Sequence, residues 1–259
     1  MKSLKMESLL QREQPFVFSC LVVLILISWA YMFYMAWGMS ETDAEITLAC
    51  LMRWGPGDLV HMFIMWAIMM MAMMLPAATP MILMFKAVNQ GQGEADEPTI
   101  SAGLFVLGYF LVWTAYSALA AMAQYVLHVS ALLTHNLVIS SPLLGGILLV
   151  AAGVFQWTPL RDTCMSKCRS PLGFLMAEWR EGRLGALIMG LKHGAFCVGC
   201  CWLLMLLSFV LGIMNLVWMA MVSIFMMIEK AYPGSQWISR TAGLILVTWG
   251  LWSVAGAMR

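Results

Sequence analysis

The segment Lys192-His193-Gly194-Ala195-Phe196-Cys197-Val198-Gly199-Cys200-Cys201 places ligand-type side chains inside a stretch hydrophobic enough to span a bilayer. Ionisable and strongly polar groups at membrane depth lose hydration, so they are rare there and usually face a bundle interior or a functional site. Each residue of an α-helix advances by about 100°. Relative to His193, Cys197 then lies near roughly +40°, Cys200 near roughly −20° and Cys201 near roughly +80°. All four side chains are therefore expected on one face.

This face has the chemistry of a soft-metal site. Residues three or four positions apart on a helix have Cβ atoms about 5–6 Å apart, which lets imidazole and thiol groups converge on one ion. Thiolates favour copper(I) and zinc(II), and imidazole suits zinc, copper, iron and nickel. We therefore expect His193, Cys197, Cys200 and Cys201 to bind a transition metal, copper before zinc. The alternative is that these cysteines act as small hydrophobic residues in a closely packed helix.

The composition is that of a membrane protein. The 259 residues are 62% hydrophobic and only 10% charged, whereas soluble domains are about 25% charged. A formal net charge of +1 without a basic tract argues against nucleic acid as a partner. We expect the lipid bilayer to surround the chain. A secreted disulfide framework is not expected, because four of the seven cysteines fall in predicted membrane helices.

Hydrophobic runs long enough to cross about 30 Å of hydrocarbon predict an all-α transmembrane bundle, with residues 1–259 forming a single integral membrane domain. Seven spans are expected, at residues 16–37, 59–85, 99–124, 141–158, 184–209, 212–230 and 237–255. Between the fourth and fifth spans, Leu172, Leu175, Met176 and Trp179 recur at helical spacing. This spacing predicts an amphipathic helix that lies in the membrane interface.

The loop charges predict the orientation. Lys and Arg residues of membrane proteins collect on the cytoplasmic side. If the N-terminus is cytoplasmic, the outer loops hold only Arg53 and Arg259, and nearly all other cations fall on the inner side or, in the case of Lys192, within a span. We therefore expect a cytoplasmic N-terminus.

Methionine is unusually frequent, with 26 copies. Steps of four from His61 give Met65, Met69 and Met73, which form a stripe along one side of the second span. Because thioethers suit copper(I), His61, Met65 and Met69 are a candidate access path for the metal. The alternative is packing alone, since methionine fills irregular apolar interiors.

The sixth span is expected to lie antiparallel to the fifth and to contribute further polar groups. Its Asn215, Met219 and Glu229 share one face with Met226. Lys192 needs a partner or a route by which its side chain reaches the interface. Glu229 is the candidate counter-ion, in a pairing that is either functional or purely structural.

Cys164 and Cys168 lie between the fourth and fifth spans, flanked by Arg161, Lys167 and Arg169. Nearby cations favour the thiolate, the form that binds metals and attacks disulfides. The pair is therefore a candidate cytosolic port for metal from a carrier protein, or a redox pair. Two incidental cysteines are the alternative.

Four stretches carry a family resemblance, and they are Met65–Pro76, Gln156–Leu160 with Cys164–Arg169, Gly190–Trp202, and Met214–Lys230. Together they resemble an uncharacterised bacterial family of predicted metal-binding integral membrane proteins. The resemblance covers most of residues 59–255, and its specific element is Cys197-Val198-Gly199-Cys200-Cys201-Trp202. It implies metal binding and the inner membrane of a bacterium, without an established mechanism.

We therefore expect a multi-pass inner-membrane protein that binds copper or zinc for transport, buffering or delivery, and we favour binding over catalysis. One alternative is a membrane thiol–disulfide oxidoreductase that acts through the same cysteines. Another is an accessory subunit that assembles a larger membrane metalloprotein complex. The expected partners are a metal carrier protein or such a complex.

Overall fold

The computed structural model describes residues 2–41, 56–91, 98–134, 138–213, 215–232, 234 and 236–258. As expected, this part of the chain is all-helical, apart from one isolated bridge between Leu133 and Ile139. The helices are α1 (Lys2–Glu41), α3 (Pro56–Gly91), α4 (Pro98–Val129), α5 (Pro142–Phe155), α6 (Pro159–Arg169), α7 (Pro171–Glu178), α8 (Gly182–Leu206), α9 (Ser208–Leu211), α10 (Leu216–Ala231) and α11 (Gln236–Ala257).

In the described part of the chain, five helices are long and apolar enough to cross a membrane: α1, α3, α4, α8 and α11. The pair α5 and α6 passes the same test only when taken together across a 63° bend, which would make a sixth span. Seven helices do lie where the sequence predicts seven spans. However, α5 and α10 have only 14 and 16 residues, short of the roughly 20 that a lone span needs. The structure thus supports five or six spans.

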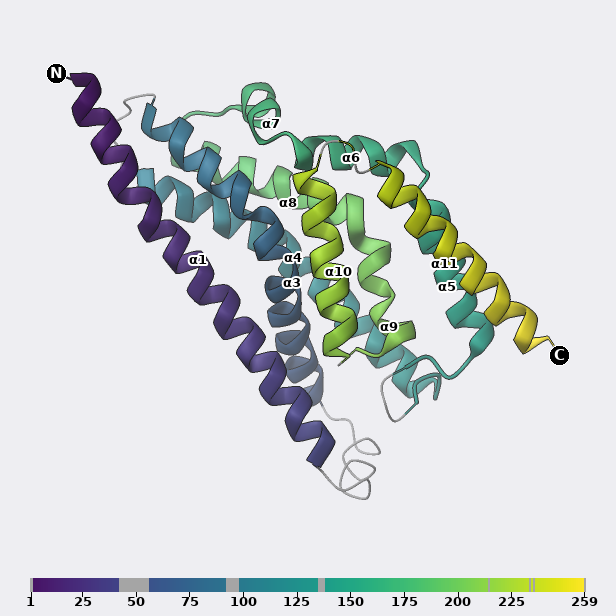
Figure 1. Ribbon diagram of the computed structural model, residues 1–259. Coiled ribbons are helices and arrows are strands. Elements are labelled where there is room, and N and C mark those ends of the chain that lie inside the picture. The colour runs from purple at the N-terminus through teal and green to yellow at the C-terminus, as the bar shows by residue number, and fades with distance from the viewer. Residues whose placement is uncertain are drawn as a thin grey trace.

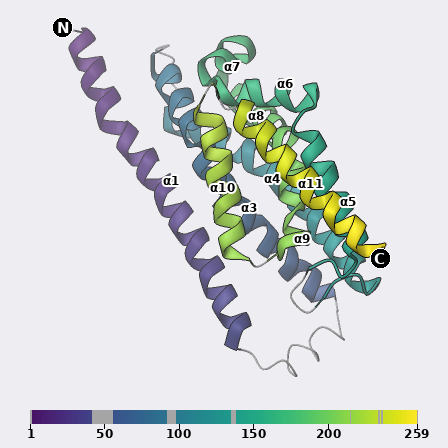
Figure 2. The same cartoon turned by 45° about the vertical axis from the view of Figure 1, so that its right-hand side comes forward.

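The central helices α3, α4, α8 and α10 pack together, with α1 along α3 on one side and the pair α5 and α11 on the other (Figures 1 and 2). The short helices α6 and α7 cross one end of the bundle, the end at which α1 begins. Helix α7 lies where the sequence predicts the amphipathic helix, and α6 is a further short helix before it. Both begin with a proline that follows a capping Thr158 or Ser170, whose side chain accepts a hydrogen bond from a backbone N–H of the first turn.

Helix α3 contains Pro76 and Pro80 and ends at Gly91, six residues beyond the end at residue 85 that the sequence predicts. Proline cannot donate to the carbonyl four residues earlier, and for Pro76 that carbonyl belongs to Ala72. The indole Nε1 of Trp29 on α1 donates to the Ala72 carbonyl at 3.1 Å. The next carbonyl, that of Met73, accepts from the Ser223 hydroxyl of α10 at 3.0 Å. Neighbouring helices therefore satisfy the backbone at the proline, as membrane helices require.

Helix α8 packs most closely on α4. A Cβ added to Gly190 would overlap the Phe105 carbonyl, and one added to Gly108 would lie 2.8 Å from the Leu191 backbone nitrogen. Small residues at a helix crossing let the two backbones approach in this way. The close neighbour of Gly190 is therefore α4.

Candidate metal centre

Four cysteines from two helices meet inside the bundle. Cys197, Cys200 and Cys201 of α8 are 0% exposed, and Cys168 of α6 is also buried. The Cys200 and Cys201 thiols donate to the Cys197 carbonyl at 3.0 and 2.9 Å. The Cys168 side chain lies close enough to those of Cys197 and Cys200 to interact with both. We call these four residues the cysteine cluster, which unites two groups that the sequence analysis treats separately.

Cys164 and Cys168 do not form the exposed port that the sequence predicts. Cys168 is only 6% exposed and belongs to the cysteine cluster. Cys164 is half-buried and packs on α8, where its Sγ would be 2.9 Å from a Cβ added to Gly199. Because the two cysteines are one helical turn apart on α6, both face α8. The absence of a side chain at Gly199 gives Cys164 its place.

Three residues that sequence reasoning missed border the cluster. The Nζ of Lys230 on α10 donates to the Cys197 sulfur at 3.0 Å, and the Tyr109 hydroxyl of α4 lies 3.2 Å from the same sulfur. The Sδ of Met74 on α3 is 4.0 Å from the Cys201 Sγ. The sequence does offer a signal for Lys230, because Lys230 and Glu229 are two adjacent charged residues at the end of an otherwise apolar helix. Nothing in the local sequence distinguishes Tyr109 or Met74 from their apolar neighbours.

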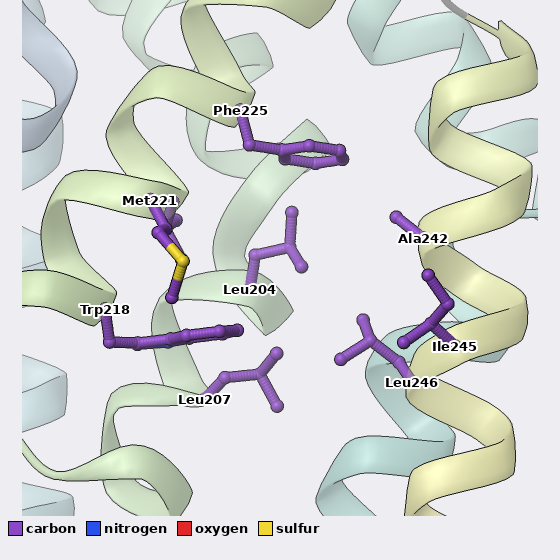
Figure 3. Close-up of a pocket in the computed structure, with 9 residues that line it drawn as sticks. Leu204, Leu207, Trp218, Met221, Phe225, Ala242, Ile245 and Leu246 are labelled. Carbon is purple, nitrogen blue, oxygen red and sulfur yellow. The ribbon is translucent and has the colours of Figure 1, made fainter.

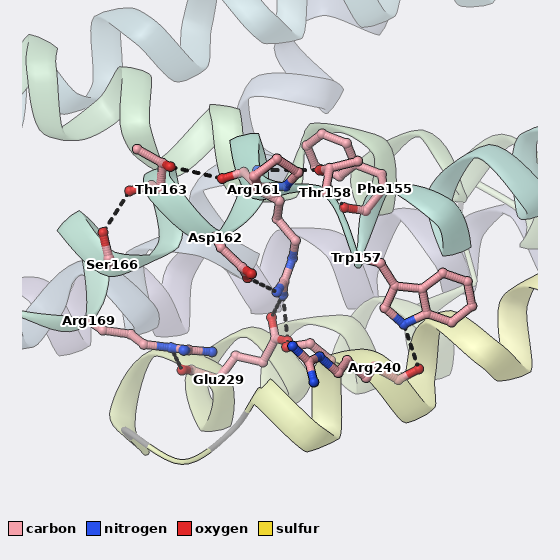
Figure 4. Close-up of polar contacts among 12 residues, drawn as sticks. Phe155, Trp157, Thr158, Arg161, Asp162, Thr163, Ser166, Arg169, Glu229 and Arg240 are labelled. Carbon is pink, nitrogen blue, oxygen red and sulfur yellow. Dashed lines mark hydrogen bonds and ion pairs between the residues drawn. The ribbon is translucent and has the colours of Figure 1, made fainter.

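The end of α10 is tied to α6 and α11 by a buried ion pair (Figure 4). The Glu229 carboxylate accepts from Arg161 Nη2 at 2.5 Å, with both side chains 0% exposed, and also accepts from the Ser239 hydroxyl. Arg169 Nε donates to the Glu229 carbonyl at 2.8 Å. Buried charges are tolerated where they are paired and hydrogen-bonded in this way. The pair fixes α6 and α10 beside each other, and so brings Cys168 and Lys230 to the same place.

The expected pairing of Lys192 with Glu229 is wrong. The Lys192 ammonium pairs with the carboxylate of Glu178, the last residue of α7. This hydrogen bond lowers the pKa of Glu178 below its usual value. Lys192 reaches toward the interface because its long side chain lets the charge leave the apolar region, whereas Glu229 is already held by Arg161.

His193 lies one turn from Cys197 and is buried among aromatic rings. Its ring centroid is 5.7 Å from that of Tyr109, 6.0 Å from Phe105 and 5.4 Å from Phe174. Its Nδ1 has no hydrogen-bond partner within the described residues. The arrangement fits an aromatic core residue, and it leaves one ring nitrogen able to bind a ligand.

The methionine stripe lies inside the bundle, as a path for a soft ion would need. Met65 and Met69 are 4% and 0% exposed, and His61 at the beginning of α3 is exposed. The helical rise places His61 roughly 18 Å from Met73, and the next residue, Met74, borders the cysteine cluster. The buried stripe therefore runs from an exposed histidine to the cluster.

The other predicted residues of the sixth span lie away from the cluster. Asn215 caps α10, where its Oδ1 accepts from the Trp218 backbone N–H at 3.1 Å and its Nδ2 donates to the Leu211 carbonyl at 3.2 Å. Met219 is fully buried, but the helical rise separates it from Lys230 by roughly 16 Å. The contribution of α10 to the cluster is Lys230.

The cluster is not a ready-made coordination sphere. Among the residues that the structure describes, no group of three or more His, Cys, Asp or Glu side chains is spaced to hold a metal ion. Cys200 and Cys201 instead use their thiol protons to hydrogen-bond the Cys197 carbonyl. The donor set itself, four thiols with a thioether nearby, is the one that copper(I) prefers.

An apolar cavity of about 260 Å³ lies between α10 and α11 (Figure 3). Trp218, Met221 and Phe225 project into it from α10, and Ile245 and Leu246 face them from α11. Its lining offers the Met221 thioether but no thiol, imidazole or carboxylate. This cavity lacks the donors that a metal centre needs.

Comparison with known proteins gives one match. A family model described as "PpoB2: Copper chaperone" matches residues 63–253, well over half of the chain and including every member of the cysteine cluster. No curated protein and no solved structure matches the chain.

Proposed function

The chain belongs to the PpoB2 copper chaperone family, and on that premise we propose that it binds copper(I) at the cysteine cluster within a membrane and delivers it to a partner. The family description supports copper as the cargo. The five long apolar helices are compatible with a multi-pass membrane protein. The loop charges favour a cytoplasmic N-terminus, and the family resemblance implies the inner membrane of a bacterium.

The chemistry of the cluster favours copper(I) over zinc. Four thiolates alone would also suit zinc, but the Met74 thioether near Cys201 is a soft ligand that suits copper(I) and is not among the usual zinc ligands. The proposed ligands are Cys168, Cys197, Cys200 and Cys201, with the Met74 thioether beside Cys201. His193 lies at the edge of the set, where its Nδ1 is available to a transient copper ion.

Copper binding would exchange intrahelical hydrogen bonds for metal–sulfur bonds. Cys200 and Cys201 now donate to the Cys197 carbonyl, so each thiol must lose its proton and turn toward the ion. Lys230 places a positive charge 3.0 Å from the Cys197 sulfur, and cations near a thiol favour the thiolate that binds metals.

The position of the cluster suits passage of the ion. On one side, the buried Met65 and Met69 lead from the exposed His61 toward Met74. On the other side, Cys168 and the half-buried Cys164 lie on α6, which crosses the opposite end of the bundle. Transfer between successive sulfur ligands along this line would allow delivery to a carrier protein or a membrane metalloprotein complex.

The observation that carries the proposal is that Cys168 of α6 lies beside Cys197 and Cys200 of α8. The test is the copper content of protein purified in detergent. The Cys197→Ser/Cys200→Ser variant should lose the copper of the wild type. Cys20→Ser is the matched control, because Cys20 is exposed on α1, and it should retain copper. Equal copper in the wild type and the double variant would overturn the proposal.

A thiol–disulfide function is the second candidate, because Cys168 and Cys197 approach each other from different helices. In that case a partner protein should be trapped as a mixed disulfide when one of the two cysteines is replaced by alanine. Under the copper proposal no such species forms, and both variants lose copper. An accessory role in assembling a metalloprotein complex would be recognised by stable co-purification with that complex.

A further inference from the structure

A cavity of about 540 Å³ reaches the cysteine cluster from the end of the bundle where α6 lies. Pro76 and Met81 of α3 form one wall, and Cys168 and Lys230 form part of the other. The cavity opens at the surface near the end of α10, because Ala231 in its lining is exposed and Arg169 is half-buried. A cluster thiol is therefore within reach of a molecule that enters from outside.

The charged side chains that line this cavity are both cationic. They are Arg169 and Lys230, and the lining contains no Asp or Glu. The Glu229 carboxylate, which accepts hydrogen bonds from Arg161 and Ser239, is not part of this lining. A cavity lined by charges of one sign attracts ions of the opposite sign. A bare copper(I) cation would be repelled here, and an anion would be drawn in.

We propose that this cavity receives copper(I) as the anionic complex of a small carboxylate-bearing thiol, and that Cys168 is the residue to which copper is first transferred. The proposal rests on the proposed function and adds the chemical form in which the cargo arrives. The volume is within the roughly 300–1,000 Å³ of small-molecule sites. Such a complex combines the negative charge that the cations recognise with copper already bound to sulfur.

The transfer is a ligand exchange without a change in oxidation state. The Cys168 sulfur forms a bond to copper(I) while one bond between copper and the donor thiolate breaks. The proton of the Cys168 thiol leaves on the departing donor thiol. Cys197 and Cys200 lie close enough to interact with Cys168, so the same exchange repeated at these residues moves copper from the cavity into the cluster.

Ala231 allows a test that leaves the cluster untouched. It lines the cavity, is exposed and is the last residue of α10, so a larger side chain there should not disturb folding. Purified protein would be loaded from the anionic copper(I)–glutathione complex or from the cationic copper(I)–acetonitrile complex. Ala231→Glu should accept copper from the anionic donor roughly three- to fivefold more slowly than the isosteric Ala231→Gln at low ionic strength, as expected for a like charge a few ångströms away. Ala231→Lys should be faster, and added salt should reduce both differences.

The cationic donor should show the opposite order, with Ala231→Glu loading faster than Ala231→Lys. Equal rates for the three variants with the anionic donor would overturn the proposal, as would wild-type protein that loads as fast from the cationic donor. The final copper content separates this result from failure of the proposed function. If the wild type reaches full loading without a donor preference, only the cavity proposal fails. If the Cys197→Ser/Cys200→Ser variant loads as fully as the wild type, the copper site itself is wrong.

Discussion

The ammonium nitrogen of Lys230 lies 3.0 Å from the sulfur of Cys197, with both side chains buried between α10 and α8. A buried ammonium is costly unless an anionic or strongly polar partner compensates it. A thiol, in contrast, can lie in an apolar interior as a small hydrophobic group. The buried ammonium of Lys230 therefore needs the Cys197 sulfur more than the Cys197 thiol needs Lys230.

We therefore expect the two single substitutions at this contact to have different effects on the free energy of unfolding. Cys197→Ala should lower the free energy of unfolding by about 3–5 kcal/mol, because it leaves the Lys230 charge buried without its partner. Lys230→Met should cost much less, since it leaves a neutral thiol. The double variant should be about as stable as Lys230→Met alone. Denaturant titration in detergent measures all three, and a double variant less stable than Cys197→Ala would contradict the pairing.

The Arg161–Glu229 pair should contribute more to stability than the other charged contact of Arg161. Arg161→Met should cost about 3–5 kcal/mol, because it leaves a carboxylate that is 0% exposed without its charge partner. Asp162→Asn is the control, since Asp162 is 48% exposed and 3.9 Å from Arg161, and it should cost no more than about 1 kcal/mol. The measurement is again denaturant titration. Similar effects of the two substitutions would show that the buried pair does not hold α6 on α10.

The same pair should set the position of Cys168. In Arg161→Met protein, mild oxidation should yield less of a disulfide between Cys168 and Cys197 than in the wild type, because α6 loses its buried ion pair with α10. Mass spectrometry of proteolytic fragments would measure this yield. An unchanged yield would mean that other contacts position Cys168.

The Glu178–Lys192 contact predicts a dependence of stability on pH. The hydrogen bond from Lys192 lowers the pKa of Glu178 in the folded protein, so its stabilising effect is present above the usual glutamate pKa of about 4.3. It is lost as the pH falls through the lowered folded-state pKa. Glu178→Gln should therefore be less stable than the wild type at about pH 7, and the difference should disappear in acid.

The control for this pH dependence is Glu181→Gln, a neighbouring exposed carboxylate. Its thermal midpoint should follow that of the wild type from neutral to acid pH. A Glu178→Gln variant that keeps the same deficit at every pH would show that the carboxylate contributes through packing instead of charge.

Close packing of α8 on α4 predicts different outcomes at three glycines. Gly190→Ala should destabilise by about 1–3 kcal/mol or more, because its Cβ would overlap the Phe105 backbone carbonyl. Gly199→Ala should cost less, since its Cβ meets only the movable Cys164 side chain at 2.9 Å. Gly103→Ala is the control, with nothing within 4 Å. Thermal unfolding in detergent would rank the three, and equal midpoints would contradict the close crossing.

The sequence was sufficient to predict an all-helical chain and a buried position for the cysteines of α8, because hydropathy and helical spacing are local properties. The structure supports five or six spans where the sequence predicts seven, since hydrophobicity alone does not reveal that α5 and α10 are short. The ion-pair partners of the charged residues could not be predicted from local sequence patterns either. Lys192 pairs with Glu178 on α7, and Glu229 pairs with Arg161 on α6, through packing that no local pattern specifies.

The meeting of α6 with α8 is the clearest case of this limit. Cys168 lies in a polar segment between predicted spans, and its flanking cations suggest exposure. The buried pair of Arg161 and Glu229 instead draws α6 onto the bundle, and Cys168 with it. The most informative part of the candidate site thus depends on a contact between residues far apart in the chain.

The central claim is that Cys168 of α6 and the cysteines of α8 bind one copper(I) ion. X-ray absorption at the copper edge, on copper-loaded wild type and on Cys168→Ser, tests it most directly. The account predicts a first coordination shell of sulfur in the wild type and fewer sulfur neighbours in the variant. A shell of nitrogen and oxygen, or a sulfur shell that the Cys168→Ser substitution leaves unchanged, would contradict it.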